Sequence, residues 1–276
     1  MSDGDTLLGG ADNLCQRWSN REICFYRRNL IADACEHPEI EMRFEWAERW
    51  LSPSRLSSYL NLCGGDVERA LELHEWNLML GRALMGDIAH FELALRNAYD
   101  RALTERFEGD EHWLFDASSP VTRPIMRKSK AKKLRDVNMV NRRAIDDARG
   151  RAHDPANPNQ VIAGLMLGFW AHMTDRSRER DLWIPYLHAA WPVGTDRAKL
   201  NLQLEAINKL RNRVAHSERL FNPKPDGCSP TRVDAEMLAL FRALSPEAYE
   251  GLYGNESKTT VERFLDDHPS PIHVGL

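Results

Sequence analysis

The sequence predicts an all-α protein, and three observations support that fold class. Apolar residues recur at helical spacing over most of the chain, most clearly at Leu200, Leu204, Ile207, Leu210 and Val214. Residues 66–108 contain no proline that would interrupt such a pattern. No alternation of polar and apolar residues joined by a turn predicts a β-hairpin. We therefore expect helices throughout, with one long helix in the N-terminal half.

The composition of the 276 residues is that of an ordinary soluble protein, with 42% apolar and 28% charged residues. Since the net charge is only −4, the whole molecule is not a polyanion binder, and any affinity for nucleic acid has to be local. The five cysteines include no CxxC pair, which argues against a disulfide framework or a zinc site. Residues 161–173, the longest apolar run, are too short to span a bilayer, and residues 1–14 lack the pattern of a signal peptide. We expect a cytoplasmic protein without membrane contact, bound metal or cofactor.

The chain divides into a weakly patterned extension at residues 1–40, a helical domain at residues 41–269 and a tail at residues 270–276. The domain begins with two short helices. Apolar and aromatic residues predict the first at residues 44–51, and Pro53 begins the second.

A long helix is expected after the turn at residues 64–65. The Asp66 carboxylate can accept hydrogen bonds from the free amides of a first turn, and Gly109 is well placed to end the helix. Gly81 and Gly86 lie within it and could mark a bend or a close approach of another backbone. The pattern predicts one long helix or two nearly collinear ones.

Residues 125–150 read as a strongly basic helix that follows a loop at residues 110–124. A solvated helix face would explain such a run of charge. The scarcity of acidic residues in a mildly acidic protein nevertheless makes this segment the first choice for contact with an RNA backbone. The proposed contact residues are Arg127, Lys128, Lys130, Lys132 and Lys133.

In the second half, Asn157 and Pro158 predict the start of a helix at residues 160–173. Its side chains are apolar nearly all round, which is typical of a helix at the centre of a fold. Asp196 opens the helix that carries the leucine series. Further helices are expected at residues 182–191, 233–244 and 261–265.

Near the end of the leucine series lie three residue types that suit phosphate chemistry: Arg211, Asn212 and His216. At roughly 100° per residue, Asn212 and His216 are about 40° apart on a helical wheel, on the face opposite Val214. Arg211 falls within the apolar stripe, about 140° from His216. A cation on a buried face is costly unless it is paired, so Arg211 has a specific task or a specific partner. From the residues alone, a structural role at the helix end and a catalytic role are equally supported.

Glu92, Arg96 and Asn97 form a second polar group, on the long helix. The spacing of Glu92 and Arg96 is that of a helix salt bridge, which is the simpler interpretation. The alternative is that Glu92, Arg96 or Asn97 lines the cleft that contains Arg211 and holds its guanidinium in place.

The segment Arg211-Asn212-Arg213-Val214-Ala215-His216 resembles the R-x4-H motif of HEPN-type ribonuclease domains. The chain from about residue 50 to 269 is similar to the Abi-like abortive-infection proteins of bacteria, which belong to that group. The segments that carry this resemblance are LSPSRLSSYL (51–60), HFELALRNAYDRAL (90–103), GLMLGFWAHM (164–173), DLW (181–183) and RNRVAHSERLF (211–221).

The resemblance implies a HEPN-like helical bundle that cleaves RNA without a metal, through attack of the 2′-hydroxyl on the neighbouring phosphate. The products are a cyclic phosphate and a 5′-hydroxyl, and DNA is not cut. His216, with an ordinary pKa of about 6.5, suits proton transfer. Arg211 suits stabilisation of the charged phosphorane, and Asn212 suits orientation of the imidazole or the phosphate.

The resemblance also implies a homodimer with facing motifs, because one histidine per chain is few for two proton transfers. It further implies a toxin-like effector in phage defence, with an antitoxin or regulatory RNA as a conceivable partner. The alternative hypothesis is a non-catalytic HEPN-like module that binds RNA or a protein, in which Arg211 and His216 are helix-end and interface residues.

Overall fold

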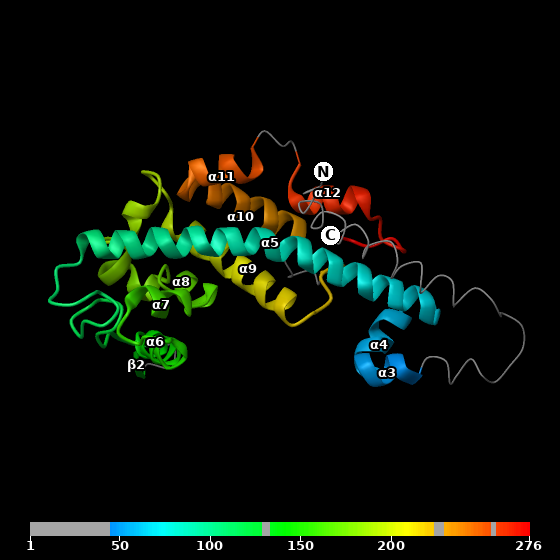
Figure 1. Cartoon of the computed structure of the whole chain (residues 1–276), viewed down its shortest axis with the longest axis horizontal. Helices are drawn as coiled ribbons and strands as arrows, with labels where there is room; N and C mark the ends of the chain where they lie inside the picture. Colours follow the sequence, from blue (N-terminus) through cyan, green and yellow to red (C-terminus); the bar gives the residue numbers. More distant parts are fainter. Residues whose placement is uncertain (1–44, 129–132, 224–228, 255–257) are drawn as a thin grey trace, which may run out of the picture. The chain divides into compact units, whose positions relative to one another are not determined.

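The computed structural model describes residues 45–128, 133–223, 229–254 and 258–276 (Figure 1). These residues are mostly helical, which confirms the all-α class. The predicted extension at residues 1–40 lies outside them. The chain forms two compact units, residues 1–58 and residues 59–276.

The described part of the first unit contains the two short helices that the sequence predicted. α3 (Glu45–Leu51) is followed by Ser52, whose φ is 68°. This left-handed residue ends α3 and is the only residue between the two helices. Pro53 then begins α4 (Pro53–Leu60), because its ring fixes a φ suited to the first turn of a helix. The last two residues of α4 belong to the second unit.

The second unit is organised around α5 (Val67–Arg106), a single helix of 40 residues and about 60 Å in length. The Asp66 carboxylate accepts a hydrogen bond from the Arg69 N–H at 3.1 Å, so the predicted N-cap is confirmed. The helix runs through Gly81 and Gly86 without interruption. A Cβ at Gly81 would make only ordinary contacts, and one at Gly86 would meet open space. Neither glycine is required by a close approach of another segment.

At Gly109, just beyond the end of α5, neighbouring atoms leave no room for a side chain. A Cβ there would lie 2.3 Å from a ring carbon of Phe107 and 2.5 Å from a carboxylate oxygen of Asp116. That oxygen is held in place because it accepts from the Asp110 N–H at 3.0 Å. Gly109 therefore lets the loop fold back against the helix end.

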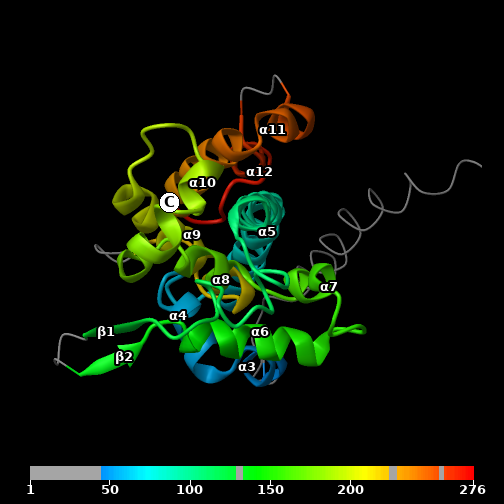
Figure 2. The ribbon, with the colours of Figure 1, turned by 90° about the vertical axis from the view of Figure 1, so that its left-hand side faces the viewer.

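The other helices of the second unit lie on both sides of α5. Figures 1 and 2 show α10, α11 and α12 on one side and α6, α7 and α8 on the other. α9 packs against α5, α8 and α10, and buries its predicted apolar series of Leu200, Leu204, Ile207 and Leu210. The bounds of these helices are α6 Met139–Arg151, α7 Pro158–Ala163, α8 Leu167–His172, α9 Arg197–Ala215, α10 Pro230–Leu244, α11 Pro246–Tyr253 and α12 Thr260–Asp267.

The prediction of one basic helix at residues 125–150 is wrong in its first half. Residues in this part form an antiparallel hairpin of β1 (Met126–Lys128) and β2 (Leu134–Asp136), and only α6 is helical (Figure 2). The Asp136 carboxylate accepts from the backbone N–H groups of Ile125 and Asn138, both at 3.0 Å. These bonds fix the base of the hairpin, which neither strand propensity nor apolar spacing indicated.

The predicted helix at residues 160–173 is divided into α7 and α8. The N-cap at Asn157 is confirmed, because its side chain accepts from the Asn159 N–H at 3.0 Å. The break follows Gly164, where a Cβ would lie 3.3 Å from the Ala148 side chain of α6. Close packing of α6 on this point and the extended backbone of Met166 separate the two helices. The prediction that this segment lies at the centre of the fold is confirmed for Trp170, whose side chain is fully buried.

The prediction of a helix at residues 182–191 is also wrong. The chain forms a π-helical turn, η2 (Glu179–Trp183), and two 3₁₀ turns, η1 (Arg176–Arg178) and η3 (Leu187–Ala190). Pro185 has no N–H to continue a helix, which explains the interruption. The sequence also missed α11.

The tail at residues 270–276 is attached to the second unit. The Asn222 N–H donates to the Gly275 carbonyl at 2.7 Å, and the Gly275 N–H donates to the Asn222 side chain at 2.6 Å. Among the described helices, none combines the length and the apolar character that a bilayer requires.

Candidate active site

The helix that carries the motif ends at His216, through a Schellman motif. The Ser217 N–H donates to the Val214 carbonyl at 3.0 Å, and the Glu218 N–H donates to the Arg213 carbonyl at 2.9 Å. Ser217 takes the left-handed position, with φ 51°. His216 is the C-cap: its N–H still donates to the Asn212 carbonyl at 3.0 Å, and the chain leaves the helix at Ser217.

The segment after the motif is fastened to α5 by a buried amide. Asn77, which is 1% exposed, donates from Nδ2 to the Glu218 carbonyl at 3.0 Å. Its Oδ1 accepts from the Leu220 N–H at 2.8 Å. The Asn77 side chain thus binds the backbone on both sides of Arg219. It attaches the segment that follows α9 to α5.

A cleft of about 360 Å³ lies among α6, α8 and α9. α9 contributes two of the three predicted catalytic residues, Arg211 and Asn212. Apolar side chains of Val140, Leu165 and Phe169 form part of its wall. Its polar lining includes Asp147, Arg151, His172, Asn208, Arg211 and Asn212.

Arg211 is half-buried at the wall of this cleft. Its Nη2 lies 3.8 Å from the Met166 sulfur, a weak acceptor. Within the part of the chain that the structure describes, no carboxylate forms an ion pair with the Arg211 guanidinium. The cation is therefore held at the cleft with donors that the described residues leave available.

Glu92 of α5 lies close enough to Arg211 for their charges to interact. Burial raises the pKa of the Glu92 carboxyl, while Arg211, the N–H of Leu167 and Arg96 act in the opposite direction. The expected salt bridge between Glu92 and Arg96 is not formed among the described residues, and the Glu92 carboxyl is affected only by the charge of Arg96, as it is by that of Arg211. Glu92, Arg96 and Asn97 do not contribute to the lining of the cleft, so the prediction that they line it is not met.

The structure does not bring His216 into the cleft with Arg211 and Asn212. Its side chain is exposed at the end of α9, and so is that of Asn212 one turn earlier. Both residues are thus exposed, as the sequence predicted, but only Asn212 lines the cleft. A single chain therefore presents Arg211 and Asn212 in the cleft and His216 outside it.

Sequence reasoning missed five polar residues of the cleft: Asn141, Asp147, Arg151, His172 and Asn208. His172 is the last residue of α8 and was grouped with an apolar segment. Asn208 of α9 packs on Gly168, where a Cβ would lie 3.3 Å from the amide oxygen. The sequence feature that could have identified His172 is its place as the one titratable residue at the end of an otherwise apolar segment.

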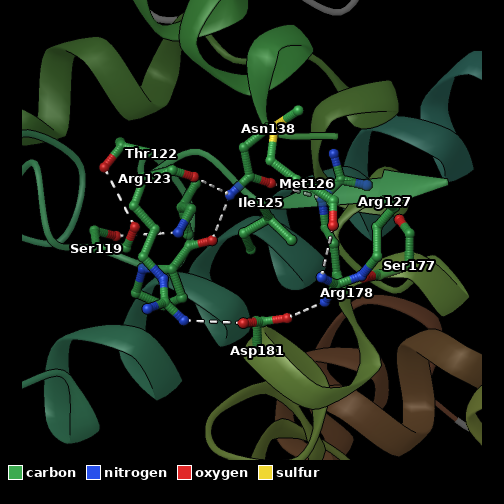
Figure 3. A network of polar contacts seen from close by, with 12 residues as sticks. Ser119, Thr122, Arg123, Ile125, Met126, Arg127, Asn138, Ser177, Arg178 and Asp181 are labelled. Carbon is green, nitrogen blue, oxygen red and sulfur yellow. Dashed lines mark hydrogen bonds and ion pairs between the residues drawn. The ribbon is translucent and has the colours of Figure 1, made fainter. Parts of the chain in front are cut away.

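Of the five residues predicted to contact RNA, those that the structure describes differ in their surroundings. Arg127 forms an ion pair with Asp181 and donates from Nε to the Ser177 carbonyl at 3.0 Å, so its guanidinium is part of the fold (Figure 3). Lys128 and Lys133 are exposed in the hairpin region. Lys130 and Lys132 lie outside the described residues.

A polar network behind the hairpin is centred on Arg178, which is 1% exposed. Its Nε donates to the Asn138 side chain and its Nη1 to the His172 carbonyl, both at 3.1 Å, and Nη2 donates to the Val137 carbonyl. Asn138 in turn donates to the carbonyls of Pro120 and Arg123, at 2.7 and 2.9 Å (Figure 3). The network joins β2, the start of α6 and the end of α8, and thereby positions two walls of the cleft.

Comparisons of the chain with protein-family models, curated proteins and solved structures find no match. In the described part of the chain, no three His, Cys, Asp or Glu side chains are grouped to hold a metal ion. The residues of the cleft and of the α9 end are therefore the features from which a function can be inferred.

Proposed function

We propose that this chain is a metal-independent RNA endonuclease, whose products carry a 2′,3′-cyclic phosphate and a 5′-hydroxyl. The observation that carries the proposal is Arg211, a cation at a cleft wall without an ion-pair partner among the described residues, next to Asn212. A guanidinium with available donors suits a phosphodiester, whose charge increases in the phosphorane. Glu92 adds a nearby negative charge that favours the guanidinium without forming an ion pair with it among the described residues.

His216 supplies a proton-transfer group at the exposed end of the same helix. Because it lies outside the cleft of its own protomer, the proposal requires two copies with facing α9 ends, so that His216 of one copy reaches the cleft of the other. A two-fold interface repeats each contact and yields two equivalent sites. Lys128 and Lys133 are placed to attract the RNA backbone from the hairpin region.

The biological setting proposed is abortive infection, in which a toxin-like effector cuts RNA in the cytoplasm and halts growth during phage attack. This part rests on the resemblance of RNRVAHSERLF and its companion segments to Abi-like HEPN proteins. An antitoxin or regulatory RNA would restrain such an effector.

The test is cleavage of single-stranded RNA by the purified protein in excess EDTA. We expect cleavage by the wild type, and a loss of about 100-fold in Arg211→Ala and in His216→Ala. The control is Arg176→Ala, which removes an exposed arginine remote in sequence from the motif. Cleavage that requires a divalent ion, or that His216→Ala retains in full, contradicts the mechanism.

The facing arrangement predicts complementation between two inactive variants. When Arg211→Ala and His216→Ala proteins are mixed, about half of the dimers are mixed, and each contains one intact site, so about a quarter of the wild-type rate returns. Each variant incubated alone is the control. A monomer in light scattering, or a mixture as inactive as its components, rules out a site shared between copies.

The exclusion of His216 from the cleft also favours the second candidate, a non-catalytic module that binds RNA or a protein. In that case RNA binds in the same assay without being cut, and Arg211→Ala weakens the binding.

A further inference from the structure

Cleavage through the 2′-hydroxyl involves two proton transfers. One group removes the proton of the 2′-hydroxyl, and another protonates the 5′-oxygen that leaves. His216 can perform one of them, but it lies outside the cleft that contains Arg211. The second group has to lie where the phosphate would bind.

His172 is the histidine that lines this cleft among the described residues. It is the last residue of α8 and shares the lining with Arg211, Asn212 and Asn208 of α9. Its imidazole remains accessible to solvent. A ligand in the cleft therefore meets an imidazole and a guanidinium together.

The backbone at His172 is held by the Arg178 network. The His172 carbonyl accepts from Arg178 Nη1 at 3.1 Å, and Arg178 is buried and bonded to Asn138 and Val137 as well. α8 itself packs against α9 and α5. The backbone that carries the imidazole is thus held by the packed helix α8 and the Arg178 network.

The surroundings of His172 keep its imidazole neutral. The cleft walls lower the pKa of His172 by desolvation, and the charges of Arg178 on η1 and Arg135 on β2 lower it further. Asp175 and Glu205, the latter on α9, oppose this effect without cancelling it. A neutral imidazole at pH 7 can accept a proton, which is the state that a general base needs.

We propose that His172 is the general base of this site, acting on an RNA strand bound along the cleft. The proton of the 2′-hydroxyl passes to His172, the 2′-oxygen forms a bond to phosphorus, and the bond from phosphorus to the 5′-oxygen breaks. The leaving oxygen takes its proton from His216 of the facing copy. Arg211 stabilises the charge on the phosphorane, and Asn208 and Asn212 offer amide donors to the strand. This assignment rests on the proposed ribonuclease function.

The experiment measures single-turnover cleavage of one RNA in EDTA between pH 5 and pH 9, for the wild type and for His172→Gln. We expect the variant to lose about 100-fold in rate, together with the limb of the profile in which activity rises as a base deprotonates. Binding of a 2′-deoxy strand, which cannot be cut, should stay within about twofold of the wild-type affinity because the amide keeps the polarity of the wall. His153→Gln, at an exposed histidine outside the cleft, is the matched control.

A second variant separates chemistry from folding. His172→Ala leaves room for a free imidazole, and added imidazole should restore part of its cleavage rate, while a structural role would give no such rescue. If the wild type cleaves RNA and His172→Gln keeps its rate and pH profile, the assignment of His172 is overturned and the ribonuclease function stands. If the wild type does not cleave RNA, the ribonuclease function itself is overturned, and the base with it.

Discussion

Replacing Asp234 with asparagine is expected to stabilise the protein at pH 8 by several kcal/mol and to flatten the pH dependence of its stability. Asp234 of α10 is 1% exposed and faces Asp87 of α5. Burial, and then the charge of Asp87, raise the pKa of Asp234 from 3.8 to about 8. Asp87 is itself fixed, since it accepts from the Tyr253 hydroxyl at 2.7 Å and from the Thr260 hydroxyl at 3.0 Å.

The sign of the effect follows from the direction of the pKa shift. Between pH 3.8 and about 8, the folded protein keeps a proton on Asp234 that the unfolded chain has lost. The contribution of Asp234 to the free energy of unfolding is therefore greatest below pH 4. It is lost as the pH rises through the pKa of the folded state. Asparagine has no proton to lose, and its NH₂ can donate to Asp87 as the protonated acid does.

Urea unfolding of wild type and Asp234→Asn at pH 5, 6, 7 and 8 measures this effect. The wild-type free energy of unfolding should fall across the series, and the variant curve should be nearly level. Asp146→Asn, at an exposed position of α6, serves as the control and should parallel the wild type. Equal slopes for wild type and Asp234→Asn are incompatible with a protonated Asp234 in the folded protein.

Replacing Arg178 with methionine is expected to destabilise the protein by about 4 kcal/mol, because removal of one partner leaves buried polar groups unpaired. The carbonyls of Val137 and His172 and the side-chain oxygen of Asn138 would each lose a hydrogen bond from the guanidinium. Methionine approximates the length of the aliphatic part, so the cavity contribution is small.

The measurement is urea unfolding of Arg178→Met beside Arg176→Met. Arg176 lies two residues away in the same turn and is exposed, so its replacement should change stability by less than about 0.5 kcal/mol. Similar losses in the two variants would show that the buried bonds of Arg178 contribute little. A large loss specific to Arg178 would establish it as the attachment between the hairpin, α6 and α8.

The parts of the fold that the sequence predicted correctly are encoded locally. Asp66 and Asp196 accept hydrogen bonds from the first-turn amides of α5 and α9, and such caps can be recognised within a few residues. The parts that it missed depend on distant partners. The hairpin is tied to Arg178 and Asp181, which lie about 40 to 50 residues further along the chain, and no periodicity within the hairpin reports them.

The candidate site divides in the same way. Residue types and resemblance identified Arg211, Asn212 and His216, and helical geometry already indicated that a straight helix would not aim Arg211 and His216 at one point. The cleft itself is built from three segments separated in sequence, and its histidine lies on a helix that the sequence joined to α7. Only the packing of α6, α8 and α9 assigns His172 to the same space as Arg211.

The attachment of the α9 exit through Asn77 has an evolutionary consequence. Its two hydrogen bonds go to backbone atoms of Glu218 and Leu220, and the exposed side chains of Glu218 and Arg219 take no part in them. Substitutions at these two positions therefore leave both hydrogen bonds of Asn77 in place, although they remove the Arg213–Glu218 ion pair or the contact of Arg219 with the Phe221 ring. The exit of the helix is therefore held through backbone atoms, whatever side chains stand at these two positions, while the buried face of α9 keeps the helix itself on α5.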